Sequence, residues 1–439
     1  MKRFLLGLAV VAVVTIGGLA VFVAVASRDV APPDEAEFAA VRPDVAPEDN
    51  AFTYFLEATN HLVEATNRQW LVDFRIGKTP ASYELRELIA KNAECLALLK
   101  RGTECAICLA PPVETIEIPV PYVSPWLHMQ GVLEARSRLA RLDGRFAEAV
   151  DDLAVGLRFG DLIQKNASSL ITYLVGTAIF GMSAESALEL ARDPAAPPET
   201  LAHLAAELER AGPFDGGLVL AMKTEHRTSC NVVDDLRAKQ EQMMLSAGID
   251  SNSNRWIKWM RNFRYFFKPN QTKRDLAEVH RFMIGQASRI YADVKFFDTS
   301  DKEGGPLAGL RPNAIGNYVF LIMLPSEKIV ESRCLTDGIL AGAKLVVACH
   351  RFARDKGRFP ETLAELVPEY LSEVPRDPFD GAPFRYSADK GLIWAVGKNL
   401  TDEGGSTRVP GVDEAVAASR NRNKAEDFTF EIQPIAKAE

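Results

Sequence analysis

An uncharged apolar run near the start of the chain restricts the fold more than any other feature. Residues 4 to 26 carry no charged side chain, and as a helix they are long enough to cross a bilayer. Lys2 and Arg3 precede the run, whereas acidic residues dominate after it, at Asp29, Asp34, Glu35 and Glu37. This asymmetry predicts a single-pass anchor at residues 1–27 in the cytoplasmic membrane, with the bulk of the chain extracytoplasmic. A cleaved signal peptide is the alternative, because Ala24-Val25-Ala26 has the small residues of a cleavage site.

The composition is that of ordinary globular protein. The chain has 439 residues, of which 47% are hydrophobic and 25% charged, so two or three domains with sizeable cores are expected. The formal net charge of -8 and the lack of a basic domain argue against nucleic acid as a partner. The expected partners are the membrane and other envelope proteins.

The middle of the chain reads as a linker followed by a large helical domain. Residues 28–49 are rich in proline, alanine and acid, which predicts an extended tether, and the helical domain is expected at 50–330. Apolar periodicity predicts helices over 52–69 and 82–99. Further helices are expected over 217–246 and 275–294, and the prolines of 110–126 indicate an extended crossing segment.

A helical hairpin is the clearest pattern in this domain. Two apolar faces, within 132–142 and 146–157, flank the turn residues Asp143-Gly144. Residues 166–184 have no charge, which fits a second membrane span, but their serines and threonines favour a buried central helix.

The last part of the chain, 331–439, predicts a small α+β domain. A helix over 336–356, with Asp337 as its cap, should end at Gly357, and Thr362 should begin a short helical segment. Residues 384–386 and 392–396 flank the turn residues Asp389-Lys390-Gly391 and predict a short antiparallel sheet. The fold class is therefore mostly α, with an N-terminal transmembrane helix and a small α+β domain.

This region resembles the C-terminal half of type II secretion pseudopilins, above all the major pseudopilin. The similarity is carried by Gly357-Arg358-Phe359-Pro360, Val374-Pro375-x-Asp377-Pro378-Phe379-x-Gly381, Tyr386, Val396-Gly397 and Asp402-x-Gly404-Gly405. It implies a long helix leading into a small sheet, and a calcium site formed by the Leu400 carbonyl, Asp402 and Asp427. The chain lacks the family's processing site, and residues 28–335 separate the apolar run from this region, so it resembles a class of bacterial membrane-anchored envelope proteins more than a fibre subunit.

A basic and aromatic stretch, residues 255–274, has seven cations and no acid. On a helix its aromatic and basic side chains separate onto two faces, which is typical of a helix in a lipid interface. The candidate membrane-interface residues are Trp256, Lys258, Trp259, Arg261, Phe263 and Arg264. The alternatives are a core helix with a basic solvated face and, last, nucleic-acid stacking.

Several smaller groups could carry chemistry. Cys105 and Cys108 have redox spacing, but they follow a helix, so a structural disulfide, for example with Cys95, or buried thiols are the alternatives. His226 and Cys230, beside Glu225, are spaced to share a metal on a helix, although packing without a metal is the default. The aspartates 377, 380, 402 and 427 are candidate paired carboxylates, or turn formers and loop residues.

No sequence pattern identifies a reaction. The chain has no Gly-x-Ser-x-Gly elbow, no His-Glu-x-x-His and no phosphate loop. We therefore expect a non-enzymatic, membrane-anchored interaction or scaffold protein, connected with secretion or pilus-type machinery. The alternative is an extracytoplasmic hydrolase with a cleft between the helical body and the C-terminal domain.

Overall fold

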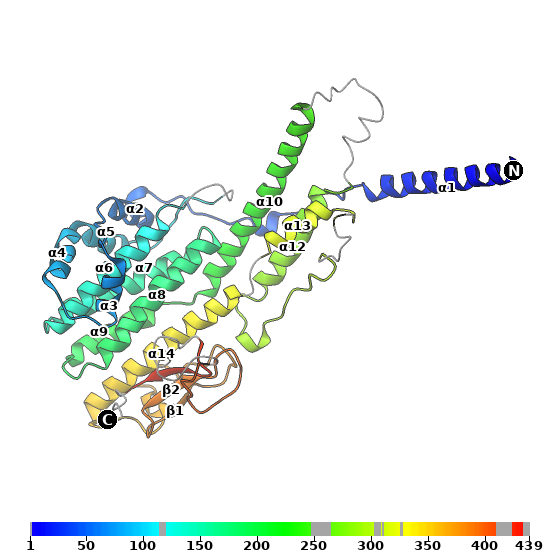
Figure 1. The fold of residues 1–439 in the computed structure, drawn as a ribbon. Helices are drawn as coiled ribbons and strands as arrows, with labels where there is room; N and C mark the ends of the chain where they lie inside the picture. Colours follow the sequence, from blue (N-terminus) through cyan, green and yellow to red (C-terminus); the bar gives the residue numbers. More distant parts are fainter. Residues whose placement is uncertain are drawn as a thin grey trace.

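Thirteen α-helices and one three-stranded sheet make up the part of the chain that the computed structural model describes, which is residues 2–113, 120–246, 265–302, 309, 311–324, 328–409 and 424–432 (Figure 1). The helices are α1 (Lys2–Ala26), α2 (Ala51–Asn60), α3 (Arg68–Arg75), α4 (Tyr83–Lys91), α5 (Ala93–Thr103), α6 (Val123–Leu142), α7 (Phe146–Lys165), α8 (Leu170–Ala191), α9 (Pro198–Arg210), α10 (Asp215–Ser246), α12 (Pro269–Ile284), α13 (Ala314–Ile322) and α14 (Lys328–Lys356). The strands are β1 (Arg385–Ser387), β2 (Leu392–Ala395) and β3 (Phe428–Glu431). The expectation of a mostly helical protein with a small antiparallel sheet is confirmed.

The predicted helical hairpin is present as α6 and α7. Gly144 in its turn has a φ of +76°, a conformation that glycine adopts without strain. Glycines also let α7 approach α8: a Cβ on Gly160 would lie 2.5 Å from the Phe180 backbone nitrogen. The three helices α6, α7 and α8 therefore form the tightly packed centre of the body.

The uncharged segment predicted at 166–184 forms the central helix α8. Ser169 caps it through a reciprocal pair of hydrogen bonds with Thr172, and Tyr173, Ile179 and Phe180 are fully buried. By length and apolarity alone, α8 is the one described helix of 18 residues or more that could span a membrane, and 56% of its most apolar window is buried in the protein. This packing matches the buried-helix alternative.

Two predicted helices are interrupted by asparagines. The prediction over 52–69 was too long, because α2 ends at Asn60 and the side chain of Asn67 caps a new helix, α3. The prediction over 82–99 is divided between α4 and α5 at Asn92. The buried Asn92 amide accepts a hydrogen bond from the Val63 nitrogen at 2.9 Å and donates one to the Val63 carbonyl at 2.9 Å. These long-range hydrogen bonds offset the free-energy cost of interrupting the helix at Asn92.

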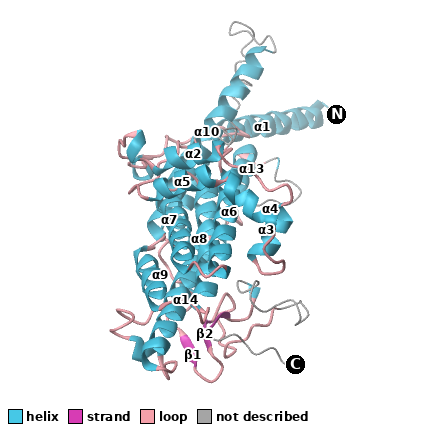
Figure 2. Cartoon of the chain, turned by 90° about the vertical axis from the view of Figure 1, so that its left-hand side faces the viewer, coloured by secondary structure: helices cyan, strands magenta, loops and turns pink. Residues whose placement is uncertain are grey.

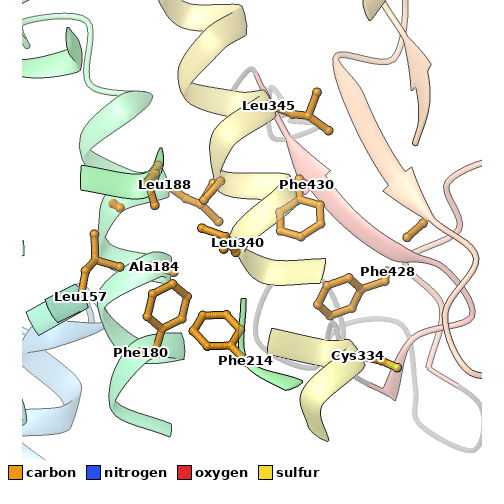
Figure 3. Packing of buried hydrophobic residues seen from close by; sticks show 14 of the residues in the cluster. Leu157, Phe180, Ala184, Leu188, Phe214, Cys334, Leu340, Leu345, Phe428 and Phe430 are labelled. Atoms are coloured by element: carbon orange, nitrogen blue, oxygen red, sulfur yellow. The ribbon is translucent and has the colours of Figure 1, made fainter. Parts of the chain in front are cut away.

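The C-terminal sheet packs on α14, which lies between it and α8 (Figure 3). The strands follow the order β1-β2-β3 and are antiparallel, and Phe428 and Phe430 of β3 are buried against α14. One continuous apolar cluster contains buried residues of both regions, the first of them Ala140 and the last Ile432. The domain boundary expected between residues 330 and 331 would therefore divide a shared apolar core, because α14 packs against both the body and the sheet.

The start of α14 differs from the expectation. Asp337 was predicted to cap a helix, but α14 begins nine residues earlier, at Lys328, and Asp337 instead pairs with Arg333 one turn before it. The predicted end of the helix is confirmed, because Gly357 follows it with a φ of +72°. The helix predicted over 275–294 also differs: α12 covers 269–284, and Pro269 occupies its first position.

Residues 28–49, which we call the strap, are extended but not a free tether. The Asp29 carboxylate accepts hydrogen bonds from the backbone nitrogens of Asn270 and Gln271, both at 3.0 Å, at the N-terminus of α12. Glu37 pairs with Arg281 of α12, and Phe38 is buried. The expectation of an unpacked linker was wrong, because the strap supplies a carboxylate to a helix terminus and an aromatic ring to the core.

Two helices leave the body at the same end of the molecule (Figures 1 and 2). Helix α1 projects as a separate rod, and the second half of α10 projects in a different direction. Their exposed surfaces differ in character: α1 exposes a series of valines, whereas residues 234–239 of α10 are exposed and mostly polar. The sheet lies at the opposite end of the body (Figure 2).

Candidate membrane-facing surface and ligand cavity

Helix α1 is apolar and almost entirely exposed. Its exposed large side chains include Val10, Val14, Leu19 and Phe22, and Val10–Ala26 is an apolar helical stretch too short to count as a full span on its own. Near its C-terminal end the Phe22 ring meets the Tyr265 ring edge to face, with centroids 6.5 Å apart. This contact places the end of α1 beside the segment that leads into α12.

Helix α13 presents an exposed apolar face next to this contact. Ile315, Tyr318 and Ile322, which we call the α13 patch, are 46%, 67% and 61% exposed. Their spacing of three and four residues puts them on one side of the helix, opposite the buried Val319 and Phe320.

The backbone connects the α13 patch to Tyr265. The Asn313 nitrogen donates to the Tyr265 carbonyl at 2.6 Å, and the Ile315 nitrogen donates to the Phe266 carbonyl at 2.8 Å. The Asn313 side chain also accepts from the Lys268 nitrogen at 2.7 Å. The patch and the end of α1 therefore lie on one hydrogen-bonded framework, and an open cavity of about 580 Å³ adjoins the patch beside Arg311 and Lys302.

The membrane-interface residues expected from sequence lie outside the described residues. Trp256, Lys258, Trp259, Arg261, Phe263 and Arg264 all fall within 247–264, between α10 and Tyr265. The α13 patch was not anticipated, although three apolar residues at helical spacing in 314–322 were a readable signal.

A cavity of about 470 Å³ lies between the helical body and the C-terminal region. It is lined by α3, α6 and α8 on one side and by α14 and β3 on the other. Met182, Leu335, Ile339 and Phe428 form apolar walls, and the polar lining includes Arg75, Glu134, Thr177, Glu185, Glu189, Arg192 and Thr336. This is the position in which a cleft was expected under the hydrolase alternative.

A buried ion pair between Arg75 and Glu134 lines this cavity. Arg75 Nε donates to Glu134 Oε2 at 2.6 Å, and Gln130 Nε2 donates to Glu134 Oε1 at 3.1 Å. Burial raises the pKa of Glu134, although Arg75 and Gln130 oppose that shift. Neither Arg75 nor Glu134 was identified from sequence. The signal that could have indicated a buried Glu134 is its place within the apolar stretch Val132-Leu133-Glu134-Ala135.

Another acid at the cavity, Glu189, is also paired with cations. Glu189 accepts hydrogen bonds from Arg138 at 2.7 Å and Arg141 at 3.3 Å. Among the described residues that line the cavity there is no histidine and no cysteine, so no nucleophile is paired with an imidazole base. The lining can bind a ligand with one apolar and one polar side, and it has no set of groups assembled for covalent catalysis.

The C-terminal aspartates hold the sheet together. Asp377 is fully buried; its carboxylate accepts from the Phe379 nitrogen at 2.8 Å and the Val396 nitrogen at 2.9 Å, and it pairs with Arg385. Arg385 also pairs with Asp380. The turn-former alternative thus describes Asp377 and Asp380 well.

The residues of the predicted calcium site lie close to one another, but the carboxylate oxygens of its two aspartates accept hydrogen bonds from N–H groups. Asp427 accepts from the backbone nitrogens of Gly405 and Ser406, both at 2.8 Å, and Asp402 accepts from the indole of Trp394 at 2.9 Å. Leu400 has a left-handed backbone with φ +56°. Calcium ligation would require these donors to turn away, and the site at Leu400, Asp402 and Asp427 stays a prediction.

All six cysteines are free thiols. Cys95 and Cys108 are buried and Cys105 is half-buried, as in the free-thiol alternative. Burial raises the pKa of Cys95 to about 11, which makes it a poor nucleophile. On α10, Cys230 Sγ lies 3.5 Å from His226 Nε2, but the carboxylate that joins them is Glu35 of the strap and not the neighbouring Glu225.

Comparisons with protein-family models, curated proteins and solved structures found no match to this chain.

Proposed function

We propose that this protein is a membrane-anchored, extracytoplasmic interaction protein whose body rests on the bilayer surface. The observation that carries the proposal is the position of the α13 patch beside the end of α1. A spanning α1 would bring Tyr265 and α13 to the level of the lipid headgroups, where an exposed Tyr and two Ile are favourable.

The energetics support an apolar environment at this end. Fully burying one large apolar side chain contributes about 1.5–3 kcal/mol, so Ile315, Tyr318 and Ile322 together favour contact with lipid over water. Arg311 and Lys302 beside the patch suit anionic headgroups. Lys2 and Arg3 in the first turn of α1, against the acidic strap after the helix, support a cytoplasmic N-terminus.

The body would then present its opposite end to partners. The sheet lies at the end of the body away from α1 (Figure 2), and the cavity lies between α8 and α14. The order of a long helix followed by a small sheet supports kinship with secretion-type pseudopilins, and the cavity between α8 and α14 offers a binding site for a segment with one apolar and one charged side. The proposed role is docking in the cell envelope.

A second candidate function is hydrolysis in the cavity. The observation that favours it is the set of acidic side chains, Glu134, Glu185 and Glu189, on one cavity wall. The pairing of Glu134 with Arg75 and of Glu189 with Arg138 favours binding over acid catalysis. An E134Q variant that abolished hydrolysis of a substrate, while keeping the fold, would support the enzyme instead.

Site-specific photo-crosslinking in membranes tests the proposal. The photoreactive amino acid p-benzoylphenylalanine replaces Tyr318 in the full chain, and Tyr83 serves as the matched control because it is also an exposed tyrosine but lies on α4, far from α1 (Figure 1). We expect lipid adducts from position 318 and none from position 83. Equal labelling at both positions, or release of the protein by alkaline carbonate, would refute the membrane placement.

A further inference from the structure

Three side chains with metal-binding atoms converge where the strap crosses α10. Glu35 comes from the strap, and His226 and Cys230 come from successive turns of α10. One ligand atom from each lies within 4.8 Å of the other two, and this is the one such group of three among the described residues. Glu35 lies 191 positions before His226 and 195 before Cys230, so only the packing of the strap brings Glu35 to the pair.

The spacing of the two helical ligands fits a single ion. Cys230 Sγ lies 3.5 Å from His226 Nε2. A tetrahedral zinc ion with bonds of about 2.3 Å to sulfur and about 2.0 Å to nitrogen holds those two atoms about 3.5 Å apart. The pair therefore needs no rearrangement to share a zinc ion.

Two buried imidazole nitrogens in this region have no hydrogen-bond partner. His226 is 1% exposed and His280 of α12 is fully buried, and their rings lie 5.1 Å apart. His280 Nδ1 lies 2.8 Å from the Leu276 carbonyl, which fixes Nε2 as the nitrogen with a free lone pair, and this Nε2 has no hydrogen-bond partner. His226 Nδ1 also has none. A water ligand on an ion bound at His226 Nε2 would supply a hydrogen-bond donor for His280 Nε2, whereas His226 Nδ1 points away from that ion.

The surroundings shield the buried side of the cluster. The Phe38 ring covers the His226 imidazole with centroids 3.8 Å apart, while Glu35 is exposed and leaves a route of entry. The nearby cations Lys273 and Arg281 are paired with Asp234 and Glu37.

We propose that Glu35, His226 and Cys230 form a zinc site that fastens the strap to α10. Cys230 binds as the thiolate, its proton passing to solvent, and His226 Nε2 and a Glu35 oxygen supply the second and third bonds. Water occupies the fourth position, with His280 as the neighbouring imidazole. The donor set of sulfur, nitrogen and oxygen suits zinc and excludes calcium and magnesium, which prefer oxygen alone.

The proposed ion would hold the strap to α10 close to the C-terminal end of α1. The strap contacts the body through hydrogen bonds that include those at Asp29 and Arg42, through an ion pair at Glu37 and through the buried Phe38, and the proposed ion adds a crosslink. This crosslink would fix the direction in which α1 leaves the body. The inference goes beyond the docking function and does not depend on it.

Cobalt binding to the full-length protein in detergent tests the site. The metal-free protein is titrated with Co²⁺, whose bond to a thiolate gives a charge-transfer absorption, and Zn²⁺ is then added to displace it. We expect one Co²⁺ per chain with that absorption, its loss in C230S, and an affinity about tenfold or more weaker in E35Q. E35Q changes an exposed side chain, so its fold should be intact, and C105S is the matched control because it removes a thiol elsewhere.

A second measurement follows the strap itself. Zinc should slow proteolysis within residues 28–49 in the wild type and in C105S, but not in E35Q. If the wild type shows no thiolate absorption, the pair is only a Cys–His hydrogen bond and the proposal fails. Absorption that survives in C230S but disappears in C105S would place the metal at Cys105 and Cys108 and would equally overturn it.

Discussion

Phe430 of β3 lies directly over Gly342 of α14, and a Cβ on Gly342 would be 2.2 Å from the Phe430 ring. The same relationship recurs one turn earlier, where a Cβ on Gly338 would lie 3.0 Å from Phe428 (Figure 3 labels both phenylalanines). The sheet can approach α14 because these two helical positions have no side chain. On its other face α14 contacts α8, so this approach joins the sheet to the body.

Gly342→Ala should destabilise the protein by about 1–3 kcal/mol, because the new methyl group overlaps a fully buried ring that cannot move aside. Denaturant unfolding of the two proteins measures the difference. Gly181→Ala is the control: it lies in α8, where the nearest atom is 3.8 Å away, and it should stabilise by up to about 1 kcal/mol. Equal stability of G342A and wild type would show that the sheet packs differently.

Asp377→Ala should cost about 3 kcal/mol, since the carboxylate accepts two backbone hydrogen bonds and pairs with Arg385 in a fully buried position. Thermal or denaturant unfolding measures the loss. Asp389→Ala, in the exposed turn between β1 and β2, should change stability by no more than about 0.5 kcal/mol. A small effect at both positions would contradict the central role of Asp377.

Acid should destabilise the protein through His350, whose pKa in the folded state is lowered to about 4 by burial, while a hydrogen bond to Ile432 opposes the shift. The unfolded chain takes up the proton near pH 6.5, so this stability is complete above pH 6.5 and is lost as the pH falls toward 4. At pH 5 the loss is about 2 kcal/mol, at 1.36 kcal/mol per pKa unit.

His350→Gln cannot be protonated, so its stability should fall by about 2 kcal/mol less than that of the wild type between pH 7 and pH 5. Urea unfolding at both pH values gives the comparison. Identical pH profiles would show that His350 is not held neutral in the folded protein.

Arg75→Met should destabilise the protein by about 3–5 kcal/mol, because it leaves the buried Glu134 carboxylate without its cation. Adding Glu134→Gln to the same chain should restore part of that stability, since the remaining amide carries no charge. A double-mutant cycle of unfolding free energies measures the coupling. Additive losses would mean that the two side chains do not pair.

Sequence patterns determined those parts of the fold that depend on neighbouring residues. The α6–α7 hairpin at Asp143-Gly144, the end of α14 at Gly357 and the β1–β2 hairpin were all predictable, because apolar periodicity and glycine conformation act within a few residues. The same local signals failed at Asn92, where hydrogen bonds to Val63 interrupt a helix that periodicity alone would continue.

Only the tertiary structure decided which distant side chains meet. Arg75 and Glu134 are 59 residues apart, and Glu35 reaches His226 only because the strap packs on α10 and α12. Such contacts depend on how helices pack across the whole core, and residue spacing along one helix carries no information about them. By itself the sequence determined the α6–α7 and β1–β2 hairpins, the end of α14 and the apolar N-terminal run. The packing of the strap, α13 and α14 decided where candidate sites are, because burial and pairing of polar groups exist only once those elements are assembled.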